Sequence, residues 1–389
     1  MEYIFWFSVA MIFYAYFGYP AVLYILSLFK QKQVLRDEEY CRDVSFIITV
    51  HNEQERLPQK IKNTLALDYP KEKLEIIFAS DASTDQTDAI VQSYPQFRLV
   101  RSPERRGKEF AQKCAVDQAH GEILVFSDVS TLLESHGIQK IVANFADPTV
   151  GCVSSEDRFV DQQGQISGEG AYVKYEMFLR RLESQVCSVV GLSGSFFAAR
   201  REVCGNWAVD LQSDFNTLLN SLKLGLRGGS DPASLGWYRD IADEKKEFSR
   251  KVRTVLRGLS VLNRNLSTLN FFRYGLFSWE LFSHKICRWL VPLFLVLAFI
   301  SNLLLISSSV FYLFLLCVQL VFYLLAAWHF VPVFRGKNKK GEAGNRITSK
   351  FISSLKIPYY FLVVNAAILL AWIRFFKGER PVYWAPSKR

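Results

Sequence analysis

Four polar clusters in the N-terminal half of the chain could carry chemistry. They are His51–Glu53, Asp81–Asp85, Arg105–Lys108 and Asp128–Ser130. Taken singly, each has a plain structural explanation, because Asp, Ser and Thr side chains commonly cap helices. As a set, they follow one another after consecutive short apolar stretches. A convergent group of polar side chains of this kind is typical of a ligand-binding or catalytic site.

The apolar stretches between the clusters predict the strands of a sheet. Strands are expected at 44–50, 74–80, 97–100 and 123–127, with helices near 53–67, 84–94 and 108–119. Nearly continuous apolar strands that alternate with amphipathic helices predict an α/β domain with a mostly parallel sheet. Ligands bind beyond the carboxyl ends of such strands, which is where the clusters lie. Further on, strands are expected at 149–160 and 195–199 and a helix at 172–186.

Uncharged runs near both ends of the chain predict membrane helices. The run Tyr3–Phe29 has no charged residue, and neither has Trp289–Phe334 apart from His329, which is taken as neutral. A spanning helix needs about 20 apolar residues, so the first run holds one span and the second holds two, hinged near Ser307–Ser309. A shorter run at 357–373 is expected to span or to be re-entrant. The first run lacks the basic segment and cleavage site of a signal peptide, which favours a retained anchor.

The formal net charge of +10 is concentrated beside these apolar runs, at 30–36 and 335–356. By the positive-inside rule both flanks are cytoplasmic, which predicts a multi-pass inner (cytoplasmic) membrane protein whose residues 30–285 are cytosolic. Basic residues in these places fit the headgroups of membrane lipids better than nucleic acid, which is not an expected partner. The seven cysteines show no metal-ligand spacing and are expected to be reduced.

These patterns divide the chain into successive parts. They are an N-terminal transmembrane anchor (1–30), an α/β domain (40–240), interfacial amphipathic helices (241–285), two transmembrane helices (286–334), a basic cytosolic loop (335–356), a transmembrane or re-entrant helix (357–376) and a tail (377–389). A soluble α/β domain of this size has no use in a simple transporter, so that class is disfavoured.

The order and spacing of the clusters resemble a known family. The runs Ile47–Glu53, Ser80–Asp85, Gly107–Lys108 and Gly121–Asp128 look like the nucleotide-sugar half of the family 2 glycosyltransferases of the bacterial membrane-bound type. The resemblance extends from about Val44 to Arg257. It implies a GT-A fold, Rossmann-like with a mostly parallel sheet, in a cytosolic domain with N-terminal and C-terminal transmembrane helices. It also implies a nucleotide-sugar donor, for which a UDP-sugar is expected.

The resemblance further implies roles for individual residues. Nucleotide-sugar binding is implied for His51, Asn52, Glu53, Asp81, Asp85, Lys108, Asp128 and Arg250. Asp81 stands where the family reads the uracil base, and Lys108 is similar to a residue near the nucleotide. Asp128-Val129-Ser130 replaces the D-x-D element that holds a divalent cation. Because Mg²⁺ keeps waters and substrate oxygens as ligands, the single carboxylate of Asp128 still predicts a site for Mg²⁺ or Mn²⁺.

Asp214 and Arg253 resemble catalytic residues of the family. The run Gly191–Arg201 is similar to the glycine-rich loop before the general base, and Asp214 follows it, beside Ser213 where an acid is usual. Inverting transfer needs one base to deprotonate the acceptor hydroxyl, and Asp214 is predicted to be that base rather than a surface residue near a helix start.

Arg253 matches the Arg of the Gln-x-x-Arg-Trp region of polymer synthases, where it would meet the diphosphate. Arg250 stands for the Gln of that region and Thr254 for the Trp. The loss of the stacking Trp ring disfavours a processive polymerase.

The sequence therefore favours an inverting glycosyltransferase that passes a sugar to a lipid-linked or envelope glycan acceptor at the cytoplasmic membrane face. A processive polysaccharide synthase is one alternative. A catalytically silent glycosyltransferase-like membrane subunit is another, which the incomplete D-x-D element and Ser213 keep open. Release of UDP would exclude the silent subunit, and the length of the product would separate the two enzymes.

Overall fold

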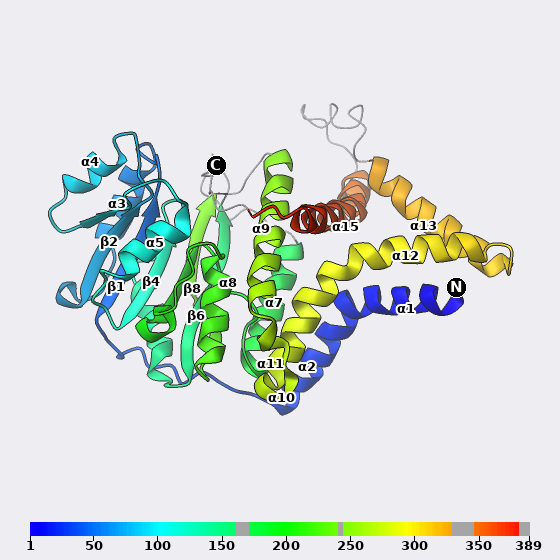
Figure 1. The fold of residues 1–389 in the computed structure, drawn as a ribbon, viewed down its shortest axis with the longest axis horizontal. Helices are drawn as coiled ribbons and strands as arrows, with labels where there is room; N and C mark the ends of the chain where they lie inside the picture. Colours follow the sequence, from blue (N-terminus) through cyan, green and yellow to red (C-terminus); the bar gives the residue numbers. More distant parts are fainter. Residues whose placement is uncertain (161–170, 240–243, 329–345, 381–389) are drawn as a thin grey trace. The chain divides into compact units, whose positions relative to one another are not determined.

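The computed structural model describes residues 1–160, 171–239, 244–328 and 346–380 (Figure 1). Two compact units are present. The sheet unit contains Pro20–Asp243 and Arg257–Phe282, and the helical unit contains Met1–Tyr19, Glu244–Leu256 and Ser283–Glu379. Much of the predicted basic loop 335–356 and most of the tail 377–389 lie outside the described residues, as do residues 241–243 of the predicted interfacial helices.

An eight-stranded mixed sheet forms the centre of the sheet unit, in the order β3-β2-β1-β4-β7-β6-β8-β5. The parallel half comprises β1 (Val44–Val50), β2 (Leu74–Ser80), β3 (Arg98–Arg101) and β4 (Ile123–Asp128). Val50 pairs with Ser80, and Thr49 pairs with Asp128. This register brings the carboxyl ends of the three neighbouring strands to one edge, so the predicted polar clusters begin there.

The other half of the sheet is mixed. It contains β5 (Leu132–Leu133), β6 (Val150–Val160), β7 (Phe196–Arg200) and β8 (Arg227–Arg239). Strand β7 runs antiparallel to its neighbours β4 and β6, whereas β8 runs parallel to β6. Neither β8 nor β5 was predicted. Strand β8 begins with Gly, Ser, Asp and Pro residues that are typical of loops, and β5 has two residues. Gly228 is needed where α8 packs on β8, since a Cβ there would lie 2.4 Å from Leu218 Cδ1.

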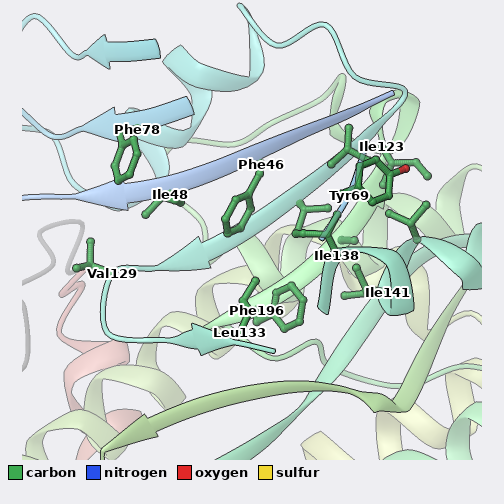
Figure 2. Packing of buried hydrophobic residues seen from close by; sticks show 14 of the residues in the cluster. Phe46, Ile48, Tyr69, Phe78, Ile123, Val129, Leu133, Ile138, Ile141 and Phe196 are labelled. Atoms are coloured by element: carbon green, nitrogen blue, oxygen red, sulfur yellow. The ribbon is translucent and has the colours of Figure 1, made fainter. Parts of the chain in front are cut away.

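Helices pack on the sheet and bury its apolar side chains. They are α3 (Leu57–Leu65), α4 (Thr87–Gln92), α5 (Lys108–Val116), α6 (Gly137–Val142), α7 (Ala171–Val186) and α8 (Ser213–Lys223). Every residue of β1 is buried, as expected for a parallel strand that is covered on both faces. Figure 2 shows the main core, in which Phe46 and Ile48 of β1 belong to the same cluster as Ile138 and Ile141 of α6.

The predicted strands and helices of the parallel half agree closely with the structure. Strands β1 and β2 have the predicted bounds, and the predicted α/β class with a largely parallel sheet is confirmed for this half. The predicted helix 53–67 is shorter than expected. Residues 53–56 instead form a turn in which the backbone amides of Arg56 and Leu57 donate to Glu53 O, and α3 begins only at Leu57.

The helical unit contains long apolar helices. They include α1 (Glu2–Phe13), α12 (Arg288–Leu305), α13 (Val310–Trp328) and α15 (Arg346–Phe376). Among the described residues, three stretches are long and apolar enough to cross a membrane, namely Glu2–Phe29, Leu276–Leu305 and Pro358–Phe376, and Val310–Ala326 is a shorter apolar helix. The break between α12 and α13 falls at residues 306–309, where the hinge was predicted.

Apolar side chains and a few buried hydrogen bonds hold the helical unit together. Phe5 of α1 packs with Ala298 of α12. A π-helical turn at Tyr14–Gly18 follows α1, and another at Phe282–Cys287 precedes α12. The Tyr14 hydroxyl lies 2.8 Å from Ser283 Oγ, and the two π-helical turns are thereby joined. Hydrogen bonds of this kind satisfy polar groups inside an apolar bundle, where water is excluded.

The region predicted to form interfacial helices is helical. It contains α9 (Glu244–Arg264), a 3₁₀ turn (Leu266–Leu269), α10 (Phe271–Tyr274) and α11 (Leu276–Leu281). Helix α9 contributes to both units, and its first half packs through Val252 on Ala367 and Ala371 of α15. A location of these helices at a membrane surface stays a prediction.

A buried ion pair fastens the linker that follows the first apolar helix to the sheet unit. Arg227 Nη2 lies 3.0 Å from Asp147 Oδ2, and its guanidinium also donates to the carbonyls of Lys32 and Gln33. Asp147 accepts further hydrogen bonds from Leu35 N and from both donors of Thr149. Because each lone pair and N–H is used within the protein, the pair is expected to stabilise the fold.

The pH dependence of unfolding tests this pair. Burial acts to raise the pKa of Asp147, but the hydrogen bonds lower it from 3.8 to about 2. A depressed folded pKa contributes stability that is present above the unfolded value and is lost as the pH falls toward 2. We expect Asp147→Asn to lower the free energy of unfolding at pH 7 by about 2 kcal/mol.

Thermal unfolding of the purified protein between pH 7 and pH 3 measures this effect. The difference between wild type and Asp147→Asn should begin to shrink below about pH 4, where the Asp147 carboxylate of the unfolded chain binds a proton while that of the folded protein stays ionised until about pH 2. The exposed carboxylate of Asp117 is a matched control, and Asp117→Asn should leave unfolding unchanged. An Asp147→Asn protein as stable as the wild type at pH 7 would contradict the assignment.

Candidate active site

The loops after β1 and β2 are locked together in a strained conformation. Asn52 and Ala82 have φ angles of 51° and 49°, and they are the non-glycine residues with positive φ in the described part of the chain. The Asn52 side chain bridges to the second loop, since Thr84 N donates to Asn52 Oδ1 at 2.8 Å and Asn52 Nδ2 donates to Thr84 Oγ1. Strained backbone of this kind costs about 1–3 kcal/mol per residue and concentrates at functional sites.

Asp81 positions the loop before α5. Its Oδ1 accepts hydrogen bonds from Arg106 N at 2.9 Å and Gly107 N at 3.0 Å, and its side chain is buried. Gly107 has a φ of 98°, a conformation that favours glycine. His51 is also buried, and its Nδ1 lies 2.8 Å from Asp81 O. Both residues thus shape the loops of the edge, while their predicted contact with a nucleotide stays a prediction.

Glu53 and Asp85 lie near Asp128 on the same edge. Burial raises the pKa of Glu53, Arg56 opposes this shift, and the charges of Asp128 and Asp85 raise the pKa further. Asp85 lies just before α4: burial acts to raise its pKa, but hydrogen bonds from Thr87 and Gln54 N lower it. The carboxylates of the first, second and fourth strand ends therefore affect one another electrostatically.

Lys108 joins the first helix position of α5 to the end of β4. Its Nζ lies 2.6 Å from Asp128 Oδ1 and donates to Gly194 O at 2.9 Å. Asp128 N in turn donates to Ser195 O. The predicted nucleotide-binding lysine, the D-x-D-like element and the glycine-rich loop therefore meet at one point, although they are far apart in the sequence.

Asp214 lies beside the same loop, at the start of α8. A Cβ on Gly194 would be 2.8 Å from Asp214 Oδ2, so the loop and the carboxylate are in close contact. Burial raises the pKa of Asp214, and the positive charge of Lys108 is the first influence that opposes it. Gln212 Nε2 and Phe215 N donate to its two oxygens. A carboxylate with a raised pKa next to a cation is a suitable proton acceptor.

Two groups near this point were missed by the sequence analysis. Arg257, in the second half of α9, forms an ion pair with Glu109 of α5 and also affects the pKa of Asp214. Arg257 lies four residues after the predicted Arg253, and residues at that spacing share a helix face. Asp157 of β6 accepts hydrogen bonds from Ser193 Oγ at 2.6 Å and Ser195 Oγ at 3.1 Å. Strand β6 showed no sequence signal for a role of Asp157.

Arg250 and Arg253 belong to the helical unit, on the first half of α9. Arg250 lies 3.7 Å from Glu247 on the same helix. The predicted contacts of both residues with the diphosphate therefore stay predictions.

The residues at the edge suit one divalent cation that is completed by a substrate. No group of three or more His, Cys, Asp or Glu side chains that could hold a metal occurs among the described residues. Asp128 offers one carboxylate, which is partly exposed, and Ser130 offers a hydroxyl. Mg²⁺ is commonly held by one or two carboxylates together with substrate phosphates, so this donor set fits a cation that arrives with a diphosphate.

The fold of the sheet unit, with its cluster of polar side chains at one edge, is that of a GT-A-type α/β domain. The model of the family described as "Glycosyl transferase family 2" matches residues 45–207, which include all four polar clusters and the glycine-rich loop. Residues 45–207 thus match the family 2 glycosyltransferases, which the motifs of this part of the chain predicted.

Curated relatives and a solved structure are similar to the chain. The poly-beta-1,6-N-acetyl-D-glucosamine synthase of Staphylococcus aureus is 26% identical over 265 residues, which cover 64% of this chain and 63% of that synthase. The synthase of the same name from Staphylococcus epidermidis is 22% identical over 379 residues, 92% of this chain and 90% of that protein. The match to the Staphylococcus aureus protein thus leaves more than a third of that synthase unmatched.

The mannosyltransferase PcManGT from Pyrobaculum calidifontis, solved in complex with GDP-Man and Mn²⁺, has a similar fold. The TM-score is 0.69 at 21% sequence identity, and the match covers 97% of this chain and 99% of that chain. The similarity confirms the predicted GT-A fold class, with apolar helices on both sides of the α/β domain in the sequence.

Gly194→Ala tests the contact between the glycine-rich loop and Asp214. The added Cβ would approach Asp214 Oδ2 to 2.8 Å, so either the loop or the carboxylate must move. Because small displacements at a reacting centre are costly, we expect turnover to fall at least ~10-fold while the protein stays folded. Gly205→Ala is the matched control, since its nearest atom is 3.4 Å away, and it should be fully active. Normal turnover by Gly194→Ala would contradict the arrangement.

Proposed function

We propose that the chain is a membrane-bound inverting glycosyltransferase that transfers a sugar from a nucleotide-sugar to an acceptor hydroxyl. The observation that carries the proposal is the meeting of Lys108, Asp128, Gly194 and Asp214 at one edge of the sheet. The Asp128 carboxylate is paired with Lys108 and suits a diphosphate with its metal. The Asp214 carboxylate has a raised pKa and suits proton transfer. A UDP-sugar is the proposed donor.

The proposed step is a single displacement. The oxygen of the acceptor hydroxyl bonds to the anomeric carbon while the bond from that carbon to the diphosphate oxygen breaks. The diphosphate leaves with the electron pair, and the hydroxyl proton passes to the Asp214 carboxylate. Attack opposite the leaving group inverts the anomeric carbon.

Several side chains would assist this displacement. Lys108 and Arg253 would balance negative charge on the diphosphate, and Arg253 can do so with two parallel hydrogen bonds. A divalent cation held by Asp128, with Ser130 beside it, would offset the charge that develops on the leaving group. His51, Asn52, Glu53, Asp81, Asp85 and Arg250 complete the proposed donor site, either by contact with the nucleoside or by shaping the loops that hold it.

The apolar helices fit an acceptor at the membrane. The charge pattern supports the proposal that residues 30–285 lie on the cytoplasmic side of the inner membrane, to which the chain is bound by several passes. A sugar acceptor carried by a lipid would then reach the domain at the bilayer surface. A lipid-linked or envelope glycan is therefore the proposed acceptor.

A processive polysaccharide synthase is the second candidate, and the relatives named poly-beta-1,6-N-acetyl-D-glucosamine synthase favour it. Thr254, which stands where polymer synthases carry the stacking Trp, favours transfer of one or a few sugars. The length of the product on a gel separates the two candidates. Products of one or a few added units support the first, and a long ladder supports the second.

A donor screen tests the enzyme directly. Purified protein in detergent is incubated with UDP-sugars and GDP-mannose, with and without Mn²⁺ or Mg²⁺, and release of the nucleoside diphosphate is measured. We expect UDP release from at least one UDP-sugar, and stimulation by the cation because Asp128 offers one carboxylate. Binding of nucleotide without turnover of any donor would instead indicate the silent subunit.

Asp214→Asn tests the proposed base. The amide keeps the shape of the carboxyl group but cannot accept the proton, so transfer should fall at least ~100-fold while UDP affinity is retained. Asp210→Asn is the matched control, because Asp210 is a partly exposed carboxylate that pairs with Arg264. Since burial raises the pKa of Asp214, the acid limb of the wild-type pH profile should lie above the usual Asp range. Full activity of Asp214→Asn would refute the assignment.

A further inference from the structure

A fully buried lysine lies behind the D-x-D-like turn. Lys60, on α3, has an exposed fraction of 0%, and its Nζ lies 5.4 Å from the centroid of the Phe46 ring. Burial lowers the pKa of Lys60 to about 7, and the charge of Asp128 opposes the shift. A buried ammonium group is costly, and an apolar side chain would fill the same space without that cost. The hydrogen bonds that the amine forms are therefore expected to explain why a lysine occupies this position.

The amine bonds to both ends of the turn that carries Asp128. Lys60 Nζ donates to Ser127 Oγ at 2.8 Å and to Thr131 O at 2.5 Å. Ser127 directly precedes the carboxylate, and Thr131 follows Ser130. Within the turn, Thr131 N donates to Asp128 O at 3.2 Å. One side chain from another element thus clamps the turn across its base.

The next turn of α3 continues this attachment. Asn63 Nδ2 donates to Leu133 O at 2.7 Å, and Leu133 N donates to Asn63 Oδ1 at 2.9 Å. Lys60 and Asn63 are three residues apart and so share a face of the helix. Helix α3 therefore holds residues 127–133 by two polar side chains, and Lys60 is the one at the carboxylate.

The position of Lys60 also fits the D-x-D-like element, which has one carboxylate in place of two. Only one carboxylate is present where the family has two, and Lys108 forms an ion pair with that carboxylate. Among the described residues Lys60 forms no ion pair of its own, and the carboxylate that affects its pKa is Asp128. Lys60 Nζ donates to Ser127 Oγ and Thr131 O and occupies neither carboxylate oxygen of Asp128.

We propose that Lys60 is a positioning residue for donor binding: it clamps the Asp128–Ser130 turn in the conformation that receives the diphosphate and its divalent cation. The proposal rests on the function proposed above. Groups that orient a metal ligand from behind change metal affinity by about 10–100-fold when they are removed. Lys60 is placed to act in this way, through Ser127 and Thr131.

Lys60→Met tests the clamp, because it keeps the length of the side chain and removes the amine. Lys62→Met is the matched control on the same helix, since Lys62 is exposed. Hydrogen exchange of the 128–131 amides is measured first and needs no ligand. We expect faster exchange in Lys60→Met and wild-type exchange in Lys62→Met. Unchanged exchange in Lys60→Met would overturn the proposal.

Affinities for Mn²⁺ and UDP, measured by calorimetry, form the second arm. In Lys60→Met both should weaken by about 10-fold or more, whereas Lys62→Met should bind like the wild type. Faster exchange with wild-type affinities would show a purely structural brace and would overturn the role in donor binding. If wild-type protein binds no nucleotide, the proposed function itself fails, and this proposal falls with it.

Ser127→Ala covers the case in which Lys60→Met does not fold. It removes one of the two acceptors and leaves the amine in place, so a smaller loss of Mn²⁺ and UDP affinity is expected. Lys62→Met again serves as the control. Wild-type affinities in a folded Ser127→Ala protein would count against the clamp and overturn the proposal.

Discussion

The ion pair between Lys108 and Asp128 is the interaction on which the site depends. It connects the start of α5 with the end of β4, and the same ammonium group donates to Gly194 O in the loop before β7. Asp214 contacts that loop and has a pKa that Lys108 acts to lower. A single cation therefore organises the parallel half of the sheet, the mixed half and the carboxylate at the start of α8.

The edge combines strained backbone with buried polar groups. Asn52 and Ala82 adopt left-handed backbone conformations. The buried Asp81 carboxylate accepts hydrogen bonds from backbone amides of the loop before α5. Lys60 is buried without an ion pair among the described residues. Each feature lowers stability by itself and is kept because the surrounding bonds overdetermine it. Strained backbone and buried polar groups that lower the stability of the fold, when they are grouped at one edge, are typical of a preorganised site for a charged ligand.

The comparisons and the structure address different questions. The family model matches residues 45–207 to the family 2 glycosyltransferases, and the solved neighbour shares the fold. The relatives are polysaccharide synthases by name, whereas Thr254 stands where the motif of polymer synthases predicts a Trp. Asp157, Ser193 and Ser195 form a hydrogen-bonded group beside the same loop, and no motif specified its arrangement.

The sequence by itself determined the parallel half of the fold and the polar clusters that lie at its edge. Strands β1 and β2 are short, apolar and bounded by polar turns, so local pattern is enough to place them. Tertiary structure alone decided β8, whose Gly-rich start forms a strand only because β6 pairs with it. It also decided the contacts of Arg257 and Lys60, because a basic residue on a helix is ordinary until its partners from distant segments are known.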